Sequence, residues 1–269
     1  MDTIRAVRCF RVSAQMELPA WEERQVGMLD TYPELATRKP PVRSKEGWHH
    51  ATYVEIETGD GATGLFGPIF AETATLILEK LAPHLIGKDP IAGEFIWDIL
   101  YRQDRHARTG NQMMAISAVD NALWDLRGKL LSQPVYRLLG GPTRERVDCY
   151  ASMLGHSLDL DPVRERAQSV VNQGFKAQKW FFRYGPADGL LGMERNVEMV
   201  HTVRDAVGPN IEIMLDCWMG WDATYAIRML ERIAEYQPRW LEEPVPPDRL
   251  GDFAAIRRAS NVPIATGEH

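Results

Sequence analysis

The sequence predicts an α+β domain followed by an α/β domain organised like the first part of a TIM barrel. Strands and then helices fill the first 130 residues, whereas strands and helices alternate from Val147 onward. Three apolar runs near the end of the chain each lead to a carboxylate, and the carboxylates Asp216, Glu242 and Glu268 are 26 residues apart. A strand, a helix and two loops need about that many residues, so we expect parallel strands with one carboxylate at the C-terminal end of each.

Residues 1–130 are predicted to form the α+β domain. Apolar and polar residues alternate, as in strands, in two segments, Ile4–Val12 and Trp48–Glu57. A Gly-rich turn over Gly59–Gly64 then leads from the second segment into a third strand at Leu65–Phe66. Helical spacing of apolar residues predicts three helices, over Ala71–Leu85, Asp89–Tyr101 and Gln112–Leu131. The last has one apolar stripe that we assign to the core: Ile116, Val119, Leu123, Leu126 and Leu130.

Residues 13–47 form a predicted loop between the first two strands, rich in proline and charged side chains. Loops of this length inside a compact domain are usually functional or disordered. Two interpretations stay open from the residues alone, a loop that serves the active site and a mobile surface loop.

Residues 131–269 are predicted to form the first part of the barrel, after the turn at Gly140-Gly141-Pro142. The first strands and helices expected there are Val147–Met153, Pro162–Gln173, Lys176–Phe182 and Met193–Val207. The three carboxylate-bearing strands follow, separated by the helical segments Ala223–Tyr236 and Leu250–Ser260. Only about five of the eight strands of a barrel are therefore present, and we expect the others to come from a further segment or a second chain.

Composition limits the classes of partner. A net charge of −6 over 269 residues argues against nucleic acid and anionic membranes as partners. The cysteines Cys9, Cys149 and Cys217 have no CxxC spacing, the N-terminal residues lack the apolar core of a signal peptide, and no run of 18 apolar residues occurs. These features predict a cytoplasmic protein with reduced thiols.

Three carboxylates at one sheet edge repel one another unless a positive charge lies between them. Oxygen ligands with open coordination positions suit Mg²⁺, so we expect a magnesium site at Asp216, Glu242 and Glu268. The alternative is that acids at strand ends cap the helices that follow, as Glu243 before Pro244 would. Capping does not require a matched repeat, which favours the metal.

Asp216, the motif WLEEP at 240–244 and the terminal GEH at 267–269 resemble the three metal-ligand strands of the enolase superfamily. The segment Ser117–Gly141 is also similar to a helix of that superfamily and its exit into the barrel. The chain is identified as a member of the mandelate racemase/muconate lactonizing enzyme family, resembling its acid-sugar dehydratases. The resemblance implies an α+β capping domain, a (β/α)7β barrel, and Mg²⁺ held by Asp216, Glu242 and Glu268.

The resemblance also implies a reaction. Such enzymes abstract the proton α to a carboxylate and eliminate a β-hydroxyl, here converting a sugar acid to a 2-keto-3-deoxy sugar acid. Lys179 matches the first lysine of the family's Lys-x-Lys pair, and Phe181 replaces the second. His269, directly after Glu268, matches a histidine of the similar acid-sugar dehydratases. The resemblance therefore implies that His269 and Lys179 are catalytic residues of this chain.

The capping loop selects substrate in this family, and we predict that its residues Trp21 and Arg43 contact the substrate. Trp218, two residues after Asp216, is also predicted to contact the substrate by packing against a sugar face. Analogy with the family also predicts a homo-oligomer. Two other interpretations stay open, a racemase or cycloisomerase of the same superfamily and a non-catalytic sugar-acid-binding protein.

Overall fold

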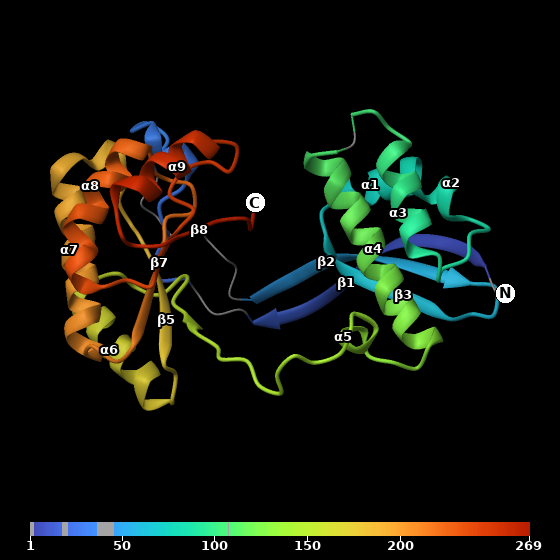
Figure 1. Ribbon diagram of the computed structural model, residues 1–269, viewed down its shortest axis with the longest axis horizontal. Helices are drawn as coiled ribbons and strands as arrows, with labels where there is room; N and C mark the ends of the chain where they lie inside the picture. Colours follow the sequence, from blue (N-terminus) through green and yellow to red (C-terminus); the bar gives the residue numbers. More distant parts are fainter. Residues whose placement is uncertain (1–2, 18–20, 37–45, 107) are drawn as a thin grey trace. The chain divides into compact units, whose positions relative to one another are not determined.

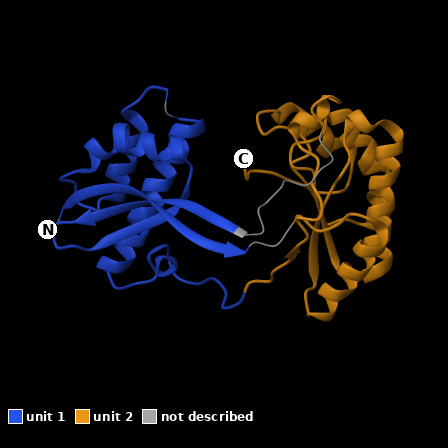
Figure 2. Ribbon diagram, turned by 180° about the vertical axis from the view of Figure 1, so that it is seen from behind, with its two compact units in different colours: residues 1–17, 46–146 blue, residues 18–45, 147–269 orange. Residues whose placement is uncertain are grey.

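The computed structural model describes residues 3–17, 21–36, 46–106 and 108–269, which divide into two compact units (Figure 2). Unit 1 comprises the described residues within 1–17 and 46–146, and unit 2 those within 18–45 and 147–269. The predicted fold class is confirmed, because unit 1 holds an antiparallel sheet with helices and unit 2 a parallel sheet with helices.

Unit 1 is built on an antiparallel sheet in the order β1-β2-β3, with strands Ile4–Glu17, Glu46–Thr58 and Thr63–Ile69. The first two strands are longer than predicted, because they stay paired out to Glu17 opposite Glu46. Residues 11–17 are all exposed, so this part of the ribbon has no buried face. A strand without a buried face needs no alternation of apolar and polar residues. The sequence pattern therefore did not predict this extension of the strands.

The helices of unit 1 cover one face of this sheet (Figure 1). The predicted helix over 71–85 is continuous but contains a π-helical turn at Ile77–Leu81 between α1 and α2. The predicted stripe of α4 faces the core, where all of its members except the half-exposed Leu130 are buried. The bounds are α1 Ala71–Leu76, α2 Ala82–Leu85, α3 Gly93–Arg102, α4 Gly110–Leu130 and α5 Val135–Leu138.

Gly64 is where β3 meets α4 most closely. A Cβ added at Gly64 would overlap the carbonyl oxygen of Ala122 and lie 2.6 Å from the Cβ of Leu126. Both obstacles belong to the rigid part of a buried helix. The contact therefore requires glycine at this strand position.

We expect Gly64→Ala to lower the free energy of unfolding by about 3 kcal/mol, because the added methyl group forces strand and helix apart. Urea denaturation followed by circular dichroism measures the loss. Gly251→Ala is the matched control, since Gly251 lies in a helix with nothing within 4 Å of its added Cβ. Equal stability of the two variants would show that β3 and α4 are not in close contact.

Unit 2 is a five-stranded parallel sheet in the order β4-β5-β6-β7-β8, which confirms the predicted βα repeat. Its helices lie along one side of the sheet (Figure 1). The strands are β4 Ala151–Ser152, β5 Ala177–Phe181, β6 Glu212–Asp216, β7 Trp240–Glu242 and β8 Ile264–Ala265. The helices are α6 Leu160–Asn172, α7 Gly189–Val207, α8 Ala223–Ile233 and α9 Leu250–Ala259.

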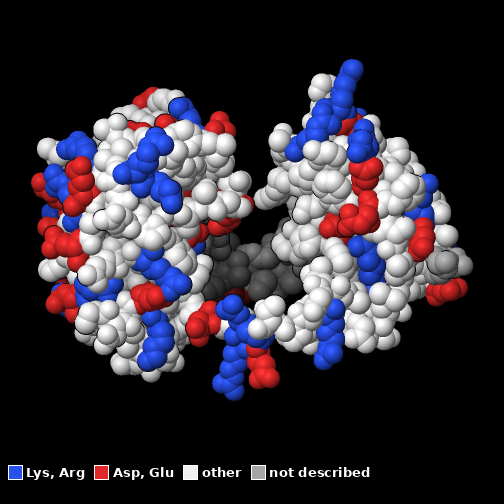
Figure 3. Space-filling model, in the orientation of Figure 1, with Lys and Arg blue, Asp and Glu red and all other residues white. Residues whose placement is uncertain are grey.

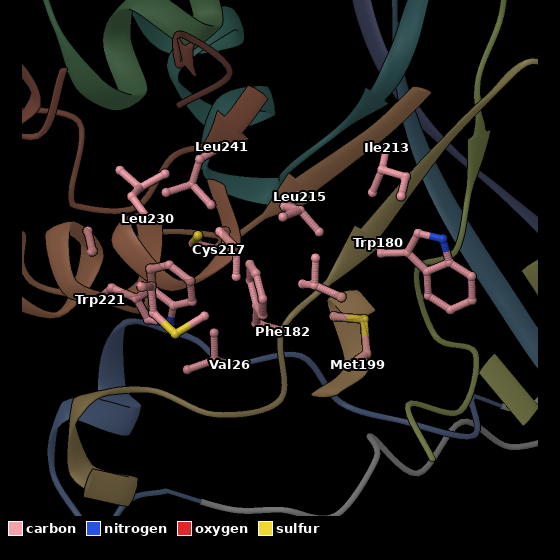
Figure 4. Close-up of a cluster of buried hydrophobic side chains, with 14 of the residues drawn as sticks. Val26, Trp180, Phe182, Met199, Ile213, Leu215, Cys217, Trp221, Leu230 and Leu241 are labelled. Carbon is pink, nitrogen blue, oxygen red and sulfur yellow. The ribbon is translucent and has the colours of Figure 1, made fainter. Parts of the chain in front are cut away.

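Successive side chains on each strand point to opposite faces of this sheet. Trp180, Leu215 and Leu241 belong to the cluster packed under the helices (Figure 4). Their neighbours Lys179, Asp216 and Glu242 therefore lie on the opposite face. The alternation of side chains along each strand thus places apolar residues in the core and charged residues on the opposite face of the sheet.

The described segment 21–36 packs on unit 2, although the sequence places it between two strands of unit 1. Val26 is fully buried beside Phe182 and Trp221 (Figure 4), and its N–H donates to the Phe182 carbonyl at 2.8 Å. A Cβ at Gly185 would lie 3.0 Å from the Val26 side chain, and one at Gly220 would lie 2.9 Å from it. Two glycines therefore leave the space that Val26 fills.

Charged side chains of both signs are interspersed over the face shown in Figure 3. No stretch of one sign dominates that face, in keeping with a net charge of −6. Among the described helices, none combines the length and the apolar character that crossing a membrane requires.

Candidate metal-binding and catalytic site

The C-terminal ends of β6 and β7 bring two of the predicted metal ligands together. Asp216 and Glu242 are the last residues of their strands and are direct neighbours in the sheet register. Lys179 reaches both from β5. Its Nζ lies 2.9 Å from Asp216 Oδ2 and 2.8 Å from Glu242 Oε1. The predicted convergence of side chains from successive strands therefore holds for these three residues.

The second oxygen of each carboxylate is bound by a tryptophan. The backbone N–H of Trp218 donates to Asp216 Oδ1 at 2.9 Å, and the indole Nε1–H of Trp240 donates to Glu242 Oε2 at 2.8 Å. Each carboxylate is thus held in one orientation, with its other oxygen directed at the lysine.

Lys179 is only 7% exposed, and its Nζ lies 5.6 Å from the ring centres of both Tyr150 and Phe181. Burial lowers the pKa of Lys179, but its hydrogen bonds to Glu242 and Asp216 outweigh that effect and raise the pKa above its usual value. Burial raises the pKa of Asp216, and nearby Glu242 adds to the rise while Lys179 opposes it. Lys179 therefore remains an ammonium ion, balanced by two carboxylates.

Glu268 and His269 are held by a residue that sequence reasoning did not select, Glu243. Its side chain is buried, and Oε1 accepts the backbone N–H groups of Gly267, Glu268 and His269 at 3.2, 3.1 and 3.4 Å. Oε2 accepts the Nδ1–H of His269 at 2.7 Å. Burial alone would raise the pKa of Glu243. These hydrogen bonds outweigh burial, so the pKa of Glu243 lies below its ordinary value. The doubled glutamate in WLEEP was the available signal, and only its first member was used.

Glu268 itself does not join the other two carboxylates, and its side chain is exposed. Within residues 3–17, 21–36, 46–106 and 108–269, no three His, Cys, Asp or Glu side chains lie close enough together to hold a metal ion. The structure therefore brings together two of the three predicted ligands.

Three non-glycine residues at these strand ends adopt left-handed backbone conformations, Trp218, Met219 and Glu243, with φ of 42°, 61° and 41°. Such conformations cost energy and are concentrated at functional sites. Trp218 is 42% exposed, and its ring centre lies 6.5 Å from that of His269 in an edge-to-face arrangement. Two predicted site residues from different strand ends thus meet.

The two substrate residues predicted in the first loop have different outcomes. Trp21 lies against Gly155, where an added Cβ would be 3.0 Å from the indole, in the loop between β4 and α6. Its neighbour Glu23 is paired with Arg183, which follows β5. Trp21 is therefore at the strand ends of unit 2. Arg43 lies outside the described residues.

The donor chemistry fits a hard divalent cation. Two carboxylate oxygens on adjacent strand ends already converge on one cationic group. Carboxylate oxygens are the ligands that Mg²⁺ prefers. Asp216 and Glu242 are thus suited to Mg²⁺, and Glu268 is on the neighbouring strand's extension.

Two family models match the chain. Residues 29–140 match the mandelate racemase/muconate lactonizing enzyme N-terminal domain, and residues 162–269 match the enolase C-terminal domain-like family. The L-rhamnonate dehydratase of Saccharopolyspora erythraea is 38% identical over 220 residues, which cover 80% of this chain and 54% of that protein. The chain therefore spans about half the length of the curated relatives it matches.

Solved structures agree with these matches. The L-rhamnonate dehydratase of Gibberella zeae is 31% identical with a TM-score of 0.81, covering 100% of this chain and 65% of that one. A racemase from Streptomyces coelicolor with bound magnesium is 30% identical with a TM-score of 0.75, covering 98% of this chain and 69% of that one. The chain belongs to the mandelate racemase/muconate lactonizing enzyme family of the enolase superfamily.

Proposed function

We propose that this chain carries the metal-binding part of the active site of a Mg²⁺-dependent sugar-acid dehydratase. The observation that carries the proposal is the convergence of Asp216 and Glu242, from adjacent strand ends, on one positive charge. Family membership and the L-rhamnonate dehydratases among the relatives support the substrate class. Asp216, Glu242 and Glu268 would hold the ion. When bound, Mg²⁺ supplies a Lewis acid that stabilises the negative charge that develops on the substrate carboxylate as the α-proton leaves.

The chain's own residues have distinct roles in this proposal. Lys179 presents an ammonium group that neutralises the substrate carboxylate. His269 is oriented by Glu243 through Nδ1, and in its imidazolium form it carries a second proton on Nε2 that it can transfer to the departing β-hydroxyl. The exposed face of Trp218 packs against the sugar carbons. The α-proton passes to a general base of the complete barrel, the β-hydroxyl leaves as water with the proton from His269, and the resulting enol tautomerises to a 2-keto-3-deoxy sugar acid.

A racemase is the second candidate, since a racemase is among the structural relatives. In this family two-base racemisation uses the second lysine of the Lys-x-Lys pair. Phe181 occupies that position, its ring lies beside Lys179, and it cannot exchange protons. The residues at the site therefore favour dehydration.

Incubation with a panel of aldonates, including L-rhamnonate, tests the proposal. We expect a product that forms a semicarbazone in the presence of Mg²⁺ and none after treatment with EDTA. Racemisation in D₂O would instead place deuterium at the α-carbon without loss of water. Stabilisation by an aldonate with neither product would identify a binding protein and contradict both catalytic interpretations.

A further inference from the structure

The pairing of Asp216 and Glu242 leaves no carboxylate oxygen between them without a hydrogen-bond donor. One oxygen of each is bound by a tryptophan N–H, and the other by the ammonium group of Lys179. We propose that Lys179 occupies the place of the metal in the metal-free protein, and that Mg²⁺ binds by displacing its ammonium group from both carboxylates. This inference rests on the proposed metal site.

Displacement follows from which oxygens are available. Releasing the other two would require Trp218 and Trp240 to leave the carboxylates, and the Trp218 donor is a backbone N–H fixed at the end of β6. The oxygens bound to Lys179 are therefore the ones that a metal ion can take. An ammonium group and a divalent cation bound to the same two oxygens would lie close together and repel each other, which favours exchange over joint binding.

The displaced ammonium group has a place to remain. The rings of Tyr150 and Phe181 each lie 5.6 Å from Nζ, and aromatic faces attract cations. These rings belong to other positions of the same unit and do not depend on the carboxylates. Lys179 therefore stays beside the site after the exchange.

The exchange changes the charge that a substrate encounters. In the metal-free arrangement one ammonium group faces two carboxylates, so the three side chains carry a net negative charge that disfavours an anion. Mg²⁺ adds two positive charges and frees the ammonium group. Lys179 is then able to bind a carboxylate only when the metal is present, which makes it a residue that couples the two binding events.

Magnesium affinity, measured by isothermal titration calorimetry, tests the exchange without requiring turnover. We expect Lys179→Met and Lys179→Gln to bind Mg²⁺ about tenfold more tightly than the natural protein, because the competing group is absent. Lys176→Met is the matched control. It removes the same charge from an exposed position just before β5, and we expect its affinity to change by less than about twofold.

Stability supplies a second measurement for the same variants. Lys179→Met leaves two carboxylates without their cation, so its melting temperature without metal should fall, and saturating Mg²⁺ should raise it by more than it raises that of the natural protein. Lys179→Gln keeps an amide donor and covers the case in which the methionine variant does not fold. Unchanged or weaker Mg²⁺ affinity in the folded variants would overturn the exchange. Failure to dehydrate any aldonate would count against the proposed function alone.

Discussion

Under the proposed function, Glu268→Gln should lower Mg²⁺-dependent turnover by roughly a thousandfold or more while leaving the fold intact. The amide has the shape of the carboxylate but not its charge, and loss of a metal ligand removes several kcal/mol of transition-state stabilisation. The Glu268 side chain is exposed, and its backbone N–H continues to donate to Glu243. Measurement of kcat/KM over a range of Mg²⁺ concentrations shows the loss.

Glu235→Gln is the control for this variant. Glu235 is another exposed glutamate of unit 2, located in the 3-10 turn after α8 and not at a strand end. Its replacement should leave both kcat and Mg²⁺ dependence unchanged. If Glu268→Gln behaves like the control, Glu268 does not hold the metal.

Glu243→Ala should lower the free energy of unfolding by about 2–3 kcal/mol, because one acceptor is removed from several hydrogen-bond donors. One buried carboxylate accepts three backbone N–H groups and the His269 ring, and alanine leaves all four donors without it. Residues 267–269 then lose their attachment to β7. Urea denaturation gives the loss, and hydrogen exchange locates it.

Glu243→Gln separates the two functions of this side chain. Its amide oxygen still accepts backbone N–H groups, so we expect the smaller loss of an ordinary hydrogen-bond change, about 1–2 kcal/mol. The variant loses the negative charge beside His269. We therefore expect kcat to fall clearly, although the free energy of unfolding falls only by this smaller amount. Glu243→Ala with the stability of the natural protein would show that the last three residues are held by other contacts.

The regular spacing of the carboxylates predicted the site only in part. Asp216 and Glu242 meet because each ends its strand and the strands are in register. Glu242 is in register with Ala265, so the second unit of the repeat closes after 23 residues and Glu268 lies three residues farther along. Equal intervals in the sequence therefore combine two unequal structural repeats. Spacing predicts parallel strands but not the register that aligns their ends.

Other features left no periodic signal at all. Val26 follows four polar residues, Glu22–Gln25, and nothing local in the sequence indicates that it enters a core formed by residues far along the chain. Glu243 was considered only as an example of a strand-end acid that would cap the next helix, whereas its partners lie 24 to 26 residues later. Periodic patterns predicted the helices and strands, and these two long-range contacts required the folded structure.

The burial of Val26 also affects how the chain folds during synthesis. Its backbone partner Phe182 emerges from the ribosome only after the whole of unit 1 has been synthesised. Until then the strands and helices of unit 2 that bury Val26 have not been synthesised. Contacts of such long sequence separation form slowly. A fragment that began at Val147 would lack Val26 and keep an unfilled slot beside Gly185 and Gly220. Unit 2 is thus one compact unit assembled from two distant stretches of chain.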